Sequence, residues 1–199
     1  KWKMNGLQAV PTQDIIHLMG LENFIYAMYD YPELVKEMMM RLADDYIIFF
    51  NWLRTEKLLL PTASDEFLNQ GTYCFTQELP AQPSQIALKD VWGYLDSQES
   101  SSISPDMYGE FIFPSYQKIA GVFGLLSYGC CEPVHSIWEQ YLSTLENLRN
   151  VSISAWCDIN YMGEQLRGKK IVFQRKPSAN FLAVDVELQE ENVREYMKE

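Results

Sequence analysis

The stretch VFGLLSYGCCEPVHSIWEQYLSTLENL, residues 122–148, decides which fold the sequence predicts. Residues 122–128 form an apolar run typical of a buried strand, and residues 136–148 repeat apolar side chains at helical spacing. Between them lie Cys130-Cys131-Glu132-Pro133 and then His135. In α/β proteins, binding and catalytic groups commonly lie where a strand passes to a helix. We therefore expect two thiols, a carboxylate and an imidazole to gather at a functional edge of the fold.

The same alternation of strand and helix continues on both sides of this stretch. Strand patterns fall at 86–94, 151–156 and 170–173, and helical patterns fall at 104–120, 158–166 and 184–199. A repeat of about 25 to 30 residues predicts parallel strands joined by right-handed crossovers. A closed barrel of this kind needs eight strands. The strands of this chain cannot close alone, so we expect the rest upstream of Lys1 or in a partner chain; an open parallel sheet is the alternative.

The first part of the chain has a different pattern. Residues 1–60 are expected to be helical, with helices at 13–29 and 32–58 that are separated at Pro32. Residues 61–85 contain several Pro and Gly residues and are expected to be irregular. We treat 1–199 as a single domain in which the helical segment 1–60 precedes strand–helix repeats over 86–185.

Composition and charge limit the partners. The net charge is −11, which argues against nucleic acid and against an anionic membrane surface as partners. No apolar stretch approaches the roughly 20 residues that span a bilayer. Two of the four cysteines are adjacent, and neighbouring cysteines rarely meet disulfide geometry. A secreted disulfide framework is therefore not expected, and we predict a reducing, cytoplasmic setting.

Five segments, in order along the chain, match the pattern of a known family. They are GLENF and DYPELV at 20–24 and 30–35, SPDMYGEFIFP at 104–114, NLRNVSIS at 147–154, and Lys176-Pro177. In these segments the chain resembles the uroporphyrinogen decarboxylase superfamily. The resemblance implies an α/β fold of the (β/α)8 TIM-barrel type, with this chain as about the C-terminal half and with extra N-terminal helices. Within that superfamily the chain looks most like a subgroup marked by Asp-x-Trp-Gly, Ser-Gln-Glu and Gly-Cys-Cys-Glu-Pro. These motifs stand here at 90–93, 97–99 and 129–133.

The resemblance also implies two kinds of chemistry. One branch of the superfamily decarboxylates the acetate arms of uroporphyrinogen without a cofactor. Another branch moves methyl groups between a corrinoid and a thiol with zinc, which it binds through His-x-Cys after a strand and through a later Cys. Here the first motif is Tyr128-Gly129-Cys130, and Gln174 and Arg175 stand near the later Cys, so only Cys130 carries over. The catalytic aspartate and arginines of the decarboxylase branch belong to the other half of the barrel.

The candidate site residues come from the loops at the strand ends. Thiolates are nucleophiles and zinc ligands, so the metal candidates are Cys130 and Cys131; the alternative is that both are small buried apolar side chains. The catalytic candidates are the carboxylates Asp96, Glu99 and Glu132. The alternative is a structural role, in which such a carboxylate caps a helix or is stabilised by the helix dipole in the first turn. Asp158 is expected to cap the helix that follows it.

The substrate-binding candidates combine polar, aromatic and basic side chains. Asp90 and Trp92 alternate with Val91 and are expected to share a strand face that lines the interior. A guanidinium such as that of Arg175 can bind a carboxylate or phosphate, or form a salt bridge at the rim. His135 is a site residue in one interpretation and a packed or surface residue in the other. The full set is Asp90, Trp92, Gln98, His135, Trp156, Arg175 and Lys176.

Three functions follow from these candidates. The first is zinc- or thiolate-assisted methyl transfer between a corrinoid or other methyl donor and a small acceptor, with a corrinoid protein as a possible partner. The second is a cofactor-free decarboxylation of uroporphyrinogen or a related acid. The third is a barrel that binds a small molecule or a corrinoid partner without catalysis.

Overall fold

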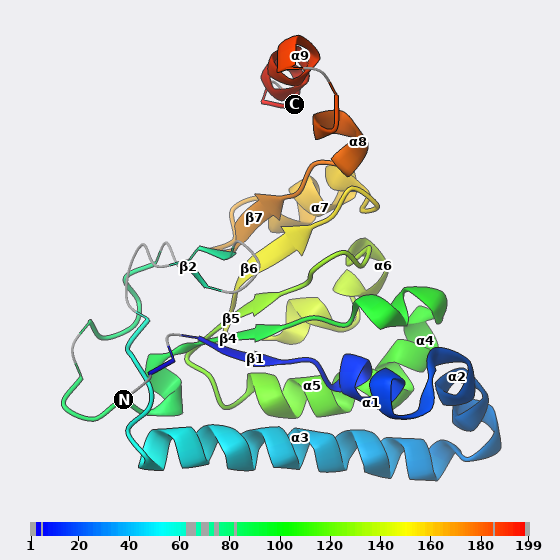
Figure 1. Ribbon diagram of the computed structural model, residues 1–199, viewed down its shortest axis with the longest axis vertical. Coiled ribbons are helices and arrows are strands. Elements are labelled where there is room, and N and C mark those ends of the chain that lie inside the picture. Colours follow the sequence, from blue (N-terminus) through cyan, green and yellow to red (C-terminus); the bar gives the residue numbers. More distant parts are fainter. Residues whose placement is uncertain are drawn as a thin grey trace.

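The computed structural model describes residues 3–4, 6–62, 67–68, 72–73, 76–81, 83–184 and 186–197. Within these residues the main sheet has five parallel strands in the order β1-β4-β5-β6-β7. The strands are β1 (Leu7–Ala9), β4 (Trp92–Leu95), β5 (Leu125–Tyr128), β6 (Leu148–Ile153) and β7 (Val172–Arg175). The predicted α/β class and parallel pairing are confirmed, and neighbours in the sheet follow chain order (Figure 1). This arrangement is compatible with part of a (β/α) barrel.

Strand β1 was not predicted, because residues 1–60 were expected to be helical. It pairs with β4 in the register Leu7↔Gly93, Gln8↔Tyr94 and Ala9↔Leu95. Leu7 and Ala9 are buried, whereas Gln8 is half-buried. Three residues are too few for an alternating pattern to be recognised in a sequence. The strand matters because it adds a fifth strand at the edge next to β4.

The helices pack beside the sheet. They are α1 (Pro11–Met19), α2 (Leu21–Asp30), α3 (Pro32–Thr55), α4 (Pro105–Met107), α5 (Phe113–Ala120), α6 (His135–Trp138), α7 (Ile159–Leu166), α8 (Ala179–Leu182) and α9 (Val186–Tyr196). The helix predicted at 13–29 is in fact two helices, because Gly20 has φ +85° and ψ 150° between α1 and α2. Only a residue without a Cβ adopts that conformation readily.

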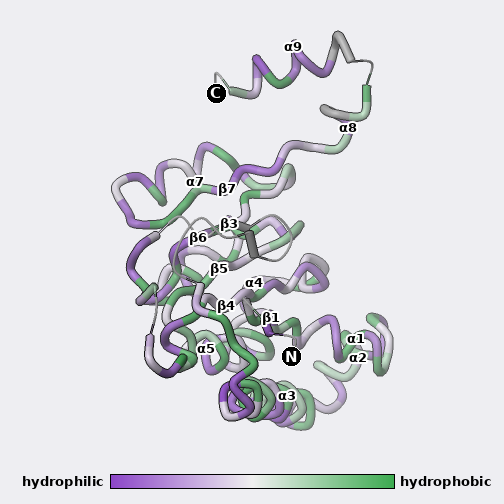
Figure 2. The backbone as a smooth tube through the Cα atoms, turned by 60° about the vertical axis from the view of Figure 1, so that its left-hand side comes forward, coloured by the Kyte–Doolittle hydropathy of each residue, from purple (hydrophilic) through white to green (hydrophobic). Residues whose placement is uncertain are grey.

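The helix predicted at 136–148 is shorter than expected. It is α6 followed by a 3-10 turn at Leu142–Thr144. The strand predicted at 86–94 begins with a 3-10 turn, Leu88–Asp90, before β4. Part of the irregular region 61–85 lies outside the described residues, but it includes the antiparallel pair β2 (Phe67–Leu68) and β3 (Thr72–Tyr73). Helix α9 matches the predicted terminal helix and lies beyond β7, away from the rest of the sheet (Figures 1 and 2).

The helix predicted at 104–120 is present with one distortion. Ser104 caps it, since its Oγ accepts a hydrogen bond from the Met107 N–H. Residues Tyr108–Ile112 form a π-helical turn between α4 and α5. Pro114 explains the turn, because it lacks an N–H and its ring would meet the carbonyl group one turn earlier in a regular α-helix.

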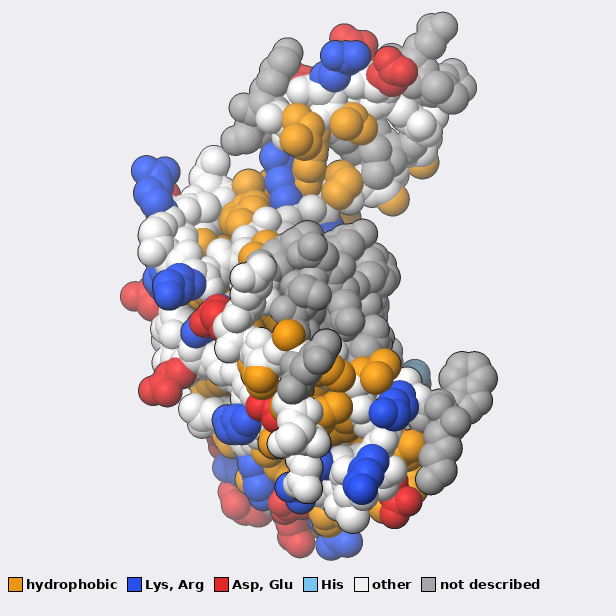
Figure 3. Space-filling model, turned by 90° about the vertical axis from the view of Figure 1, so that its left-hand side faces the viewer, with side chains coloured by type: hydrophobic (Ala, Val, Ile, Leu, Met, Phe, Trp, Pro, Cys, Tyr) orange, Lys and Arg blue, Asp and Glu red, His pale blue; other side chains and the backbone are white. Residues whose placement is uncertain are grey.

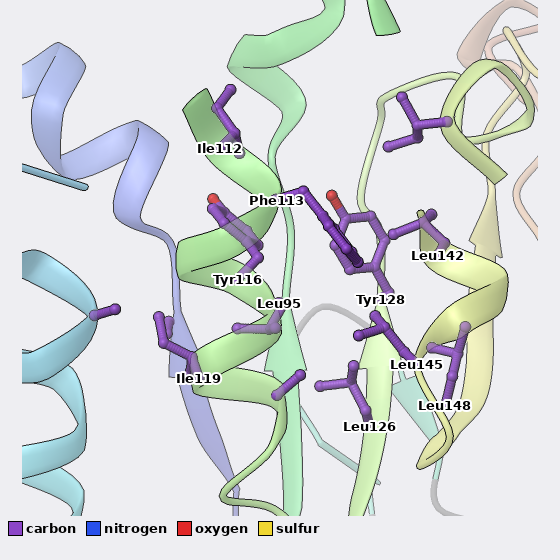
Figure 4. Close-up of a cluster of buried hydrophobic side chains, with 14 of the residues drawn as sticks. Leu95, Ile112, Phe113, Tyr116, Ile119, Leu126, Tyr128, Leu142, Leu145 and Leu148 are labelled. Atoms are coloured by element: carbon purple, nitrogen blue, oxygen red, sulfur yellow. The ribbon is translucent and has the colours of Figure 1, made fainter. Parts of the chain in front are cut away.

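The main core lies between the sheet and the helices. Leu95, Leu126 and Tyr128 come from β4 and β5 and meet Ile112, Phe113 and Tyr116 (Figure 4). Helix α3 packs along α5, on the far side of α5 from the sheet (Figure 1). Burial of these apolar side chains is the main driving force for this layer. The core therefore fixes α5 and the two central strands relative to each other.

The chain's surface is mixed in charge on one side. On the face at the amino ends of the strands, acidic and basic side chains are interspersed with apolar ones (Figure 3). No helix within the described residues is long and apolar enough to cross a membrane. All five strands of the sheet end at the opposite side, where α1, α4 and α6 lie (Figure 1). The loops at that side carry most of the predicted site residues.

Candidate functional site

The site lies on the sheet face that points away from the helices. On β4, Leu95 belongs to the helix-side core, so Trp92, Tyr94 and then Asp96 point the other way. Three polar side chains extend this face across the next strands: Asn150 Nδ2 donates to Ser127 Oγ and to Gln174 Oε1, each at 2.8 Å. We call this surface the inner face. A buried, hydrogen-bonded polar surface at the strand ends is unusual for a core and typical of a binding site.

Glu132 holds two strand-end loops together. Its Oε1 accepts from the Ser97 N–H at 2.9 Å, and its Oε2 accepts from the Cys130 N–H at 2.8 Å. Only 2 % of Glu132 is exposed. Burial raises the pKa of this carboxyl, and the backbone donors oppose that shift because they favour the charged form. Both oxygens are thus occupied, so Glu132 is a positioning residue for the loops after β4 and β5.

Asp96 is a second buried carboxyl at these strand ends. It is 1 % exposed, and neither carboxyl oxygen has a well-formed hydrogen bond within the described residues. Burial, then the charges of Glu132 and Glu99, raise the pKa of Asp96 to about 7. The nearby Tyr94 and Gln8 side chains act in the opposite direction. Asp96 therefore exchanges a proton close to neutral pH, as an acid–base catalyst must.

Glu99 joins this group through residues of the first helix. Its Oε2 accepts from Thr12 Oγ1 at 2.9 Å, and its Oε1 accepts from Gln13 Nε2 at 3.4 Å. Thr12 Oγ1 also lies 2.9 Å from the hydroxyl of Tyr116, which donates to the Asp96 carbonyl at 2.7 Å. Sequence reasoning missed Thr12, Gln13 and Tyr116, because no local pattern relates them to the strand-end loops.

The two adjacent thiols differ in exposure but lie together. Cys130 is 8 % exposed and Cys131 is exposed, and their Sγ atoms are 3.6 Å apart. Burial, and then the neighbouring Cys131, raise the pKa of Cys130 to about 12, while the charge of Lys176 opposes the shift. Cys130 is therefore held as a thiol near neutral pH.

The described residues do not fit the predicted zinc site. No group of three or more His, Cys, Asp or Glu side chains within them is arranged to hold a metal ion. Tyr128, at the position of the family's histidine, is buried and its hydroxyl is 2.8 Å from that of Tyr108. Each Glu132 oxygen accepts a backbone hydrogen bond, which fixes the direction of this carboxylate toward the loops. A tetrahedral site needs more than the two sulfur atoms present here.

The two predicted basic residues point to different places. Lys176 Nζ donates to the Cys130 carbonyl at 3.2 Å, so its charge lies at the loop that carries Cys130 and Glu132. Arg175 lies over the Tyr196 ring at 3.8 Å and donates to the Tyr196 carbonyl at 3.3 Å. Consecutive strand residues face opposite sides, so only one of the pair can serve the inner face. Lys176 is that residue.

An open depression of about 550 Å³ borders this cluster. It is lined by Gln98, Glu99, Ser101, Cys131, Pro133 and Trp156. Trp156 is 74 % exposed, which is unusual for so large an apolar ring. The structure therefore brings the predicted residues Gln98, Glu99, Cys131 and Trp156 to one surface. Asp96 is buried and is not among the residues that line this depression.

Three predicted residues have local structural contacts instead. Asp90 lies in the turn before β4, where its Oδ2 accepts from the Ala87 N–H at 2.8 Å, so it does not share a strand face with Trp92. Trp92 is fully buried with Leu79 and Leu125. His135 Nδ1 accepts from the Asp158 N–H at 3.1 Å. The predicted cap is confirmed, since Asp158 Oδ1 accepts from the Tyr161 N–H at 2.9 Å.

Comparison of the chain with protein-family models, curated proteins and solved structures gives no match. The resemblance to the uroporphyrinogen decarboxylase superfamily therefore rests on the sequence motifs alone and remains an expectation.

Proposed function

We propose that this chain carries the catalytic surface of a cofactor-free decarboxylase that acts on a small carboxylic acid, with Asp96 as the proton donor. The observation that carries the proposal is the environment of Asp96, which is buried, has two oxygens without well-formed hydrogen bonds and has a pKa of about 7. Perturbed carboxyl groups of this kind concentrate at catalytic sites. Of the three candidate functions, a lyase reaction uses this group most directly.

The reaction needs a proton for the substrate carbon and a positive charge that binds a substrate carboxylate. Loss of CO2 breaks a carbon–carbon bond and leaves its electron pair on the substrate carbon, and the protonated Asp96 carboxyl donates its proton to that carbon. Solvent then returns a proton to Asp96. Lys176, whose Nζ already lies at the Cys130 carbonyl, would bind a substrate carboxylate by charge. The exposed ring of Trp156 would pack against an apolar or planar part of the substrate.

In this proposal the active site belongs to a complete barrel, to which this chain contributes some of the strands. The five parallel strands in chain order support a (β/α)8 barrel of which this chain supplies a part. Following the family resemblance, we propose a tetrapyrrole such as uroporphyrinogen as the first substrate to test. The catalytic aspartate of that family belongs to the other half of the barrel, so Asp96 would be a proton donor of this chain's own.

Two measurements test the proposal. The first is a carbon-13 titration of the Asp96 carboxyl, which needs no substrate and should give a pKa near 7. The second is release of CO2 from uroporphyrinogen by the whole protein. Asp96→Asn should lower the rate at least about 100-fold, whereas the exposed Asp106→Asn should not change it. An Asp96 that titrates near 4, or an unchanged rate in Asp96→Asn, would overturn the assignment.

Methyl transfer is the second candidate, and the 3.6 Å sulfur pair beside the depression is the observation that favours it. It requires further metal ligands from outside the described residues. Metal analysis of protein purified without chelator is its test. Fewer than about one zinc in ten chains, in folded protein, would remove the metal-dependent form of this candidate.

A further inference from the structure

Cys130 and Cys131 form a pair of thiols at the edge of the depression that the proposed acid–base chemistry does not use. Their sulfur atoms lie 3.6 Å apart and are not joined in a disulfide. Cys131 is exposed and lines the depression, while Cys130 lies beneath it and is nearly buried. One sulfur can thus meet a solute, and the other is placed to react with the first.

We propose that Cys130 and Cys131 are a reversible oxidation site that takes up a low-molecular-weight disulfide, such as oxidised glutathione, and becomes an intrachain disulfide. This modification is independent of which substrate the depression binds. It also alters the loop that borders Asp96, so it would act as a redox control of the site.

The exchange is balanced in two steps. Cys131 loses its proton to solvent and attacks one sulfur of the external disulfide, which releases one thiol and leaves a mixed disulfide on Cys131. Cys130 then loses its proton and attacks the Cys131 sulfur, which releases the second thiol. Two protein thiols are oxidised and one external disulfide is reduced to two thiols. The order follows from exposure, because only Cys131 is accessible to the external disulfide.

The second step is slow at neutral pH and accelerates as the pH rises. Burial, which persists in the mixed disulfide, raises the pKa of Cys130, so few molecules carry the attacking thiolate. The charge of Lys176 opposes this shift. The mixed disulfide therefore accumulates briefly before the ring closes.

Ring closure conflicts with the contacts that hold this loop. Neighbouring Cα atoms are about 3.8 Å apart across a trans peptide, whereas ordinary disulfides join Cα atoms about 4.4–6.8 Å apart. No rotation widens this spacing, so the ring is strained, and joining sulfur atoms that now lie 3.6 Å apart requires a reorientation of the peptide unit between the two cysteines. Its carbonyl, that of Cys130, now accepts from Ser152 Oγ at 3.0 Å and from Lys176 Nζ at 3.2 Å. Movement of this group would release Lys176 and strain the Cys130 N–H contact to Glu132. The same strain makes the disulfide easy to reduce.

Peptide mapping tests the modification without any activity assay. Reduced, folded protein is treated with oxidised glutathione, remaining thiols are alkylated, and the protein is digested with trypsin. Residues 119–149 form one tryptic peptide that contains both cysteines. We expect this peptide to lose two hydrogen atoms and to carry neither alkyl group nor glutathione, and excess dithiothreitol should restore two alkylatable thiols. A stable glutathione adduct on Cys131, or a link to Cys74 or Cys157, would overturn the proposal.

Three variants fix the roles. Cys130→Ser should stop at the glutathione adduct on Cys131, and Cys131→Ser should not react. Cys157→Ser, which removes a thiol as buried as that of Cys130, should form the ring like the wild type. Circular dichroism checks that each variant is folded.

The effect on the loop has its own readout. Amide hydrogen exchange at Cys130 and Ser97 should become about tenfold faster in the oxidised protein, because both amides are held by Glu132. Reduction should reverse the change. If mapping shows the disulfide but hydrogen exchange at both amides is unchanged, the proposed redox control of the site is wrong.

Discussion

Glu132 accepts the Ser97 N–H at 2.9 Å, although the two residues are 35 positions apart in the chain. The same carboxylate also accepts the Cys130 N–H, so one buried side chain connects the loops after β4 and β5. Asp96 immediately precedes Ser97, and its carboxyl therefore depends on Glu132 for its position. The charge of Glu132 also contributes to the raised pKa of Asp96.

Replacing Glu132 should destabilise the protein. Glu132→Ala leaves two buried N–H groups without an acceptor, which should lower the free energy of unfolding by about 2–4 kcal/mol. Urea denaturation measures the loss, and Glu139→Ala on the exposed surface is the control, for which we expect less than about 0.5 kcal/mol. Equal midpoints for the two variants would contradict the proposed positioning role.

Replacing Asp96 should stabilise the protein at alkaline pH. The folded pKa of about 7 lies above the usual aspartate value of 3.8, so the folded state binds more protons between these values and stability falls as the pH rises through that window. Asp96→Asn removes this loss. Its gain over wild type should grow from near zero at about pH 4 to at most about 4 kcal/mol at pH 8. Denaturation series at several pH values measure it, with Asp106→Asn expected to follow the wild type.

The proposed decarboxylation should be fastest below neutral pH. Asp96 donates a proton, so the rate should fall as the pH rises through the Asp96 pKa of about 7. A pH–rate profile with uroporphyrinogen measures this. A rate that rises through pH 7 would instead make Asp96 a base and would contradict its role as proton donor.

Gly129 should not tolerate a side chain. Its φ is +99°, and a Cβ would lie 3.3 Å from Ser152 and from Val134. Gly129→Ala should therefore cost about 1–3 kcal/mol. Gly163 is the matched control, because it lies in α7 and a Cβ there meets nothing within 4 Å. Gly163→Ala should stabilise by about 0.5–1 kcal/mol, and thermal denaturation compares the two.

Local features of the fold could be predicted from the sequence. Asp158 was predicted as a helix cap because a short polar side chain before a helical pattern has one common role. The four strand–helix units from β4 onward were found from their periodicity, although their boundaries shifted by a few residues. Strand β1 and the break at Gly20 were missed, because three residues carry no period and a glycine inside a helical pattern is often tolerated.

The sequence by itself determined the α/β class, the parallel strands and the strand-end location of Asp96, Glu99 and the segment from Cys130 to Pro133. Only the tertiary structure decided their roles. It paired both oxygens of Glu132 with backbone donors, left the oxygens of Asp96 without such donors, and turned Arg175 away from Lys176. Periodicity reports which residues share an element, but the pKa and the hydrogen bonds of a carboxyl depend on what other elements bring to it. For Asp96 those groups include Gln8 of β1 and Glu132 of the loop after β5, neither of which is near it in sequence.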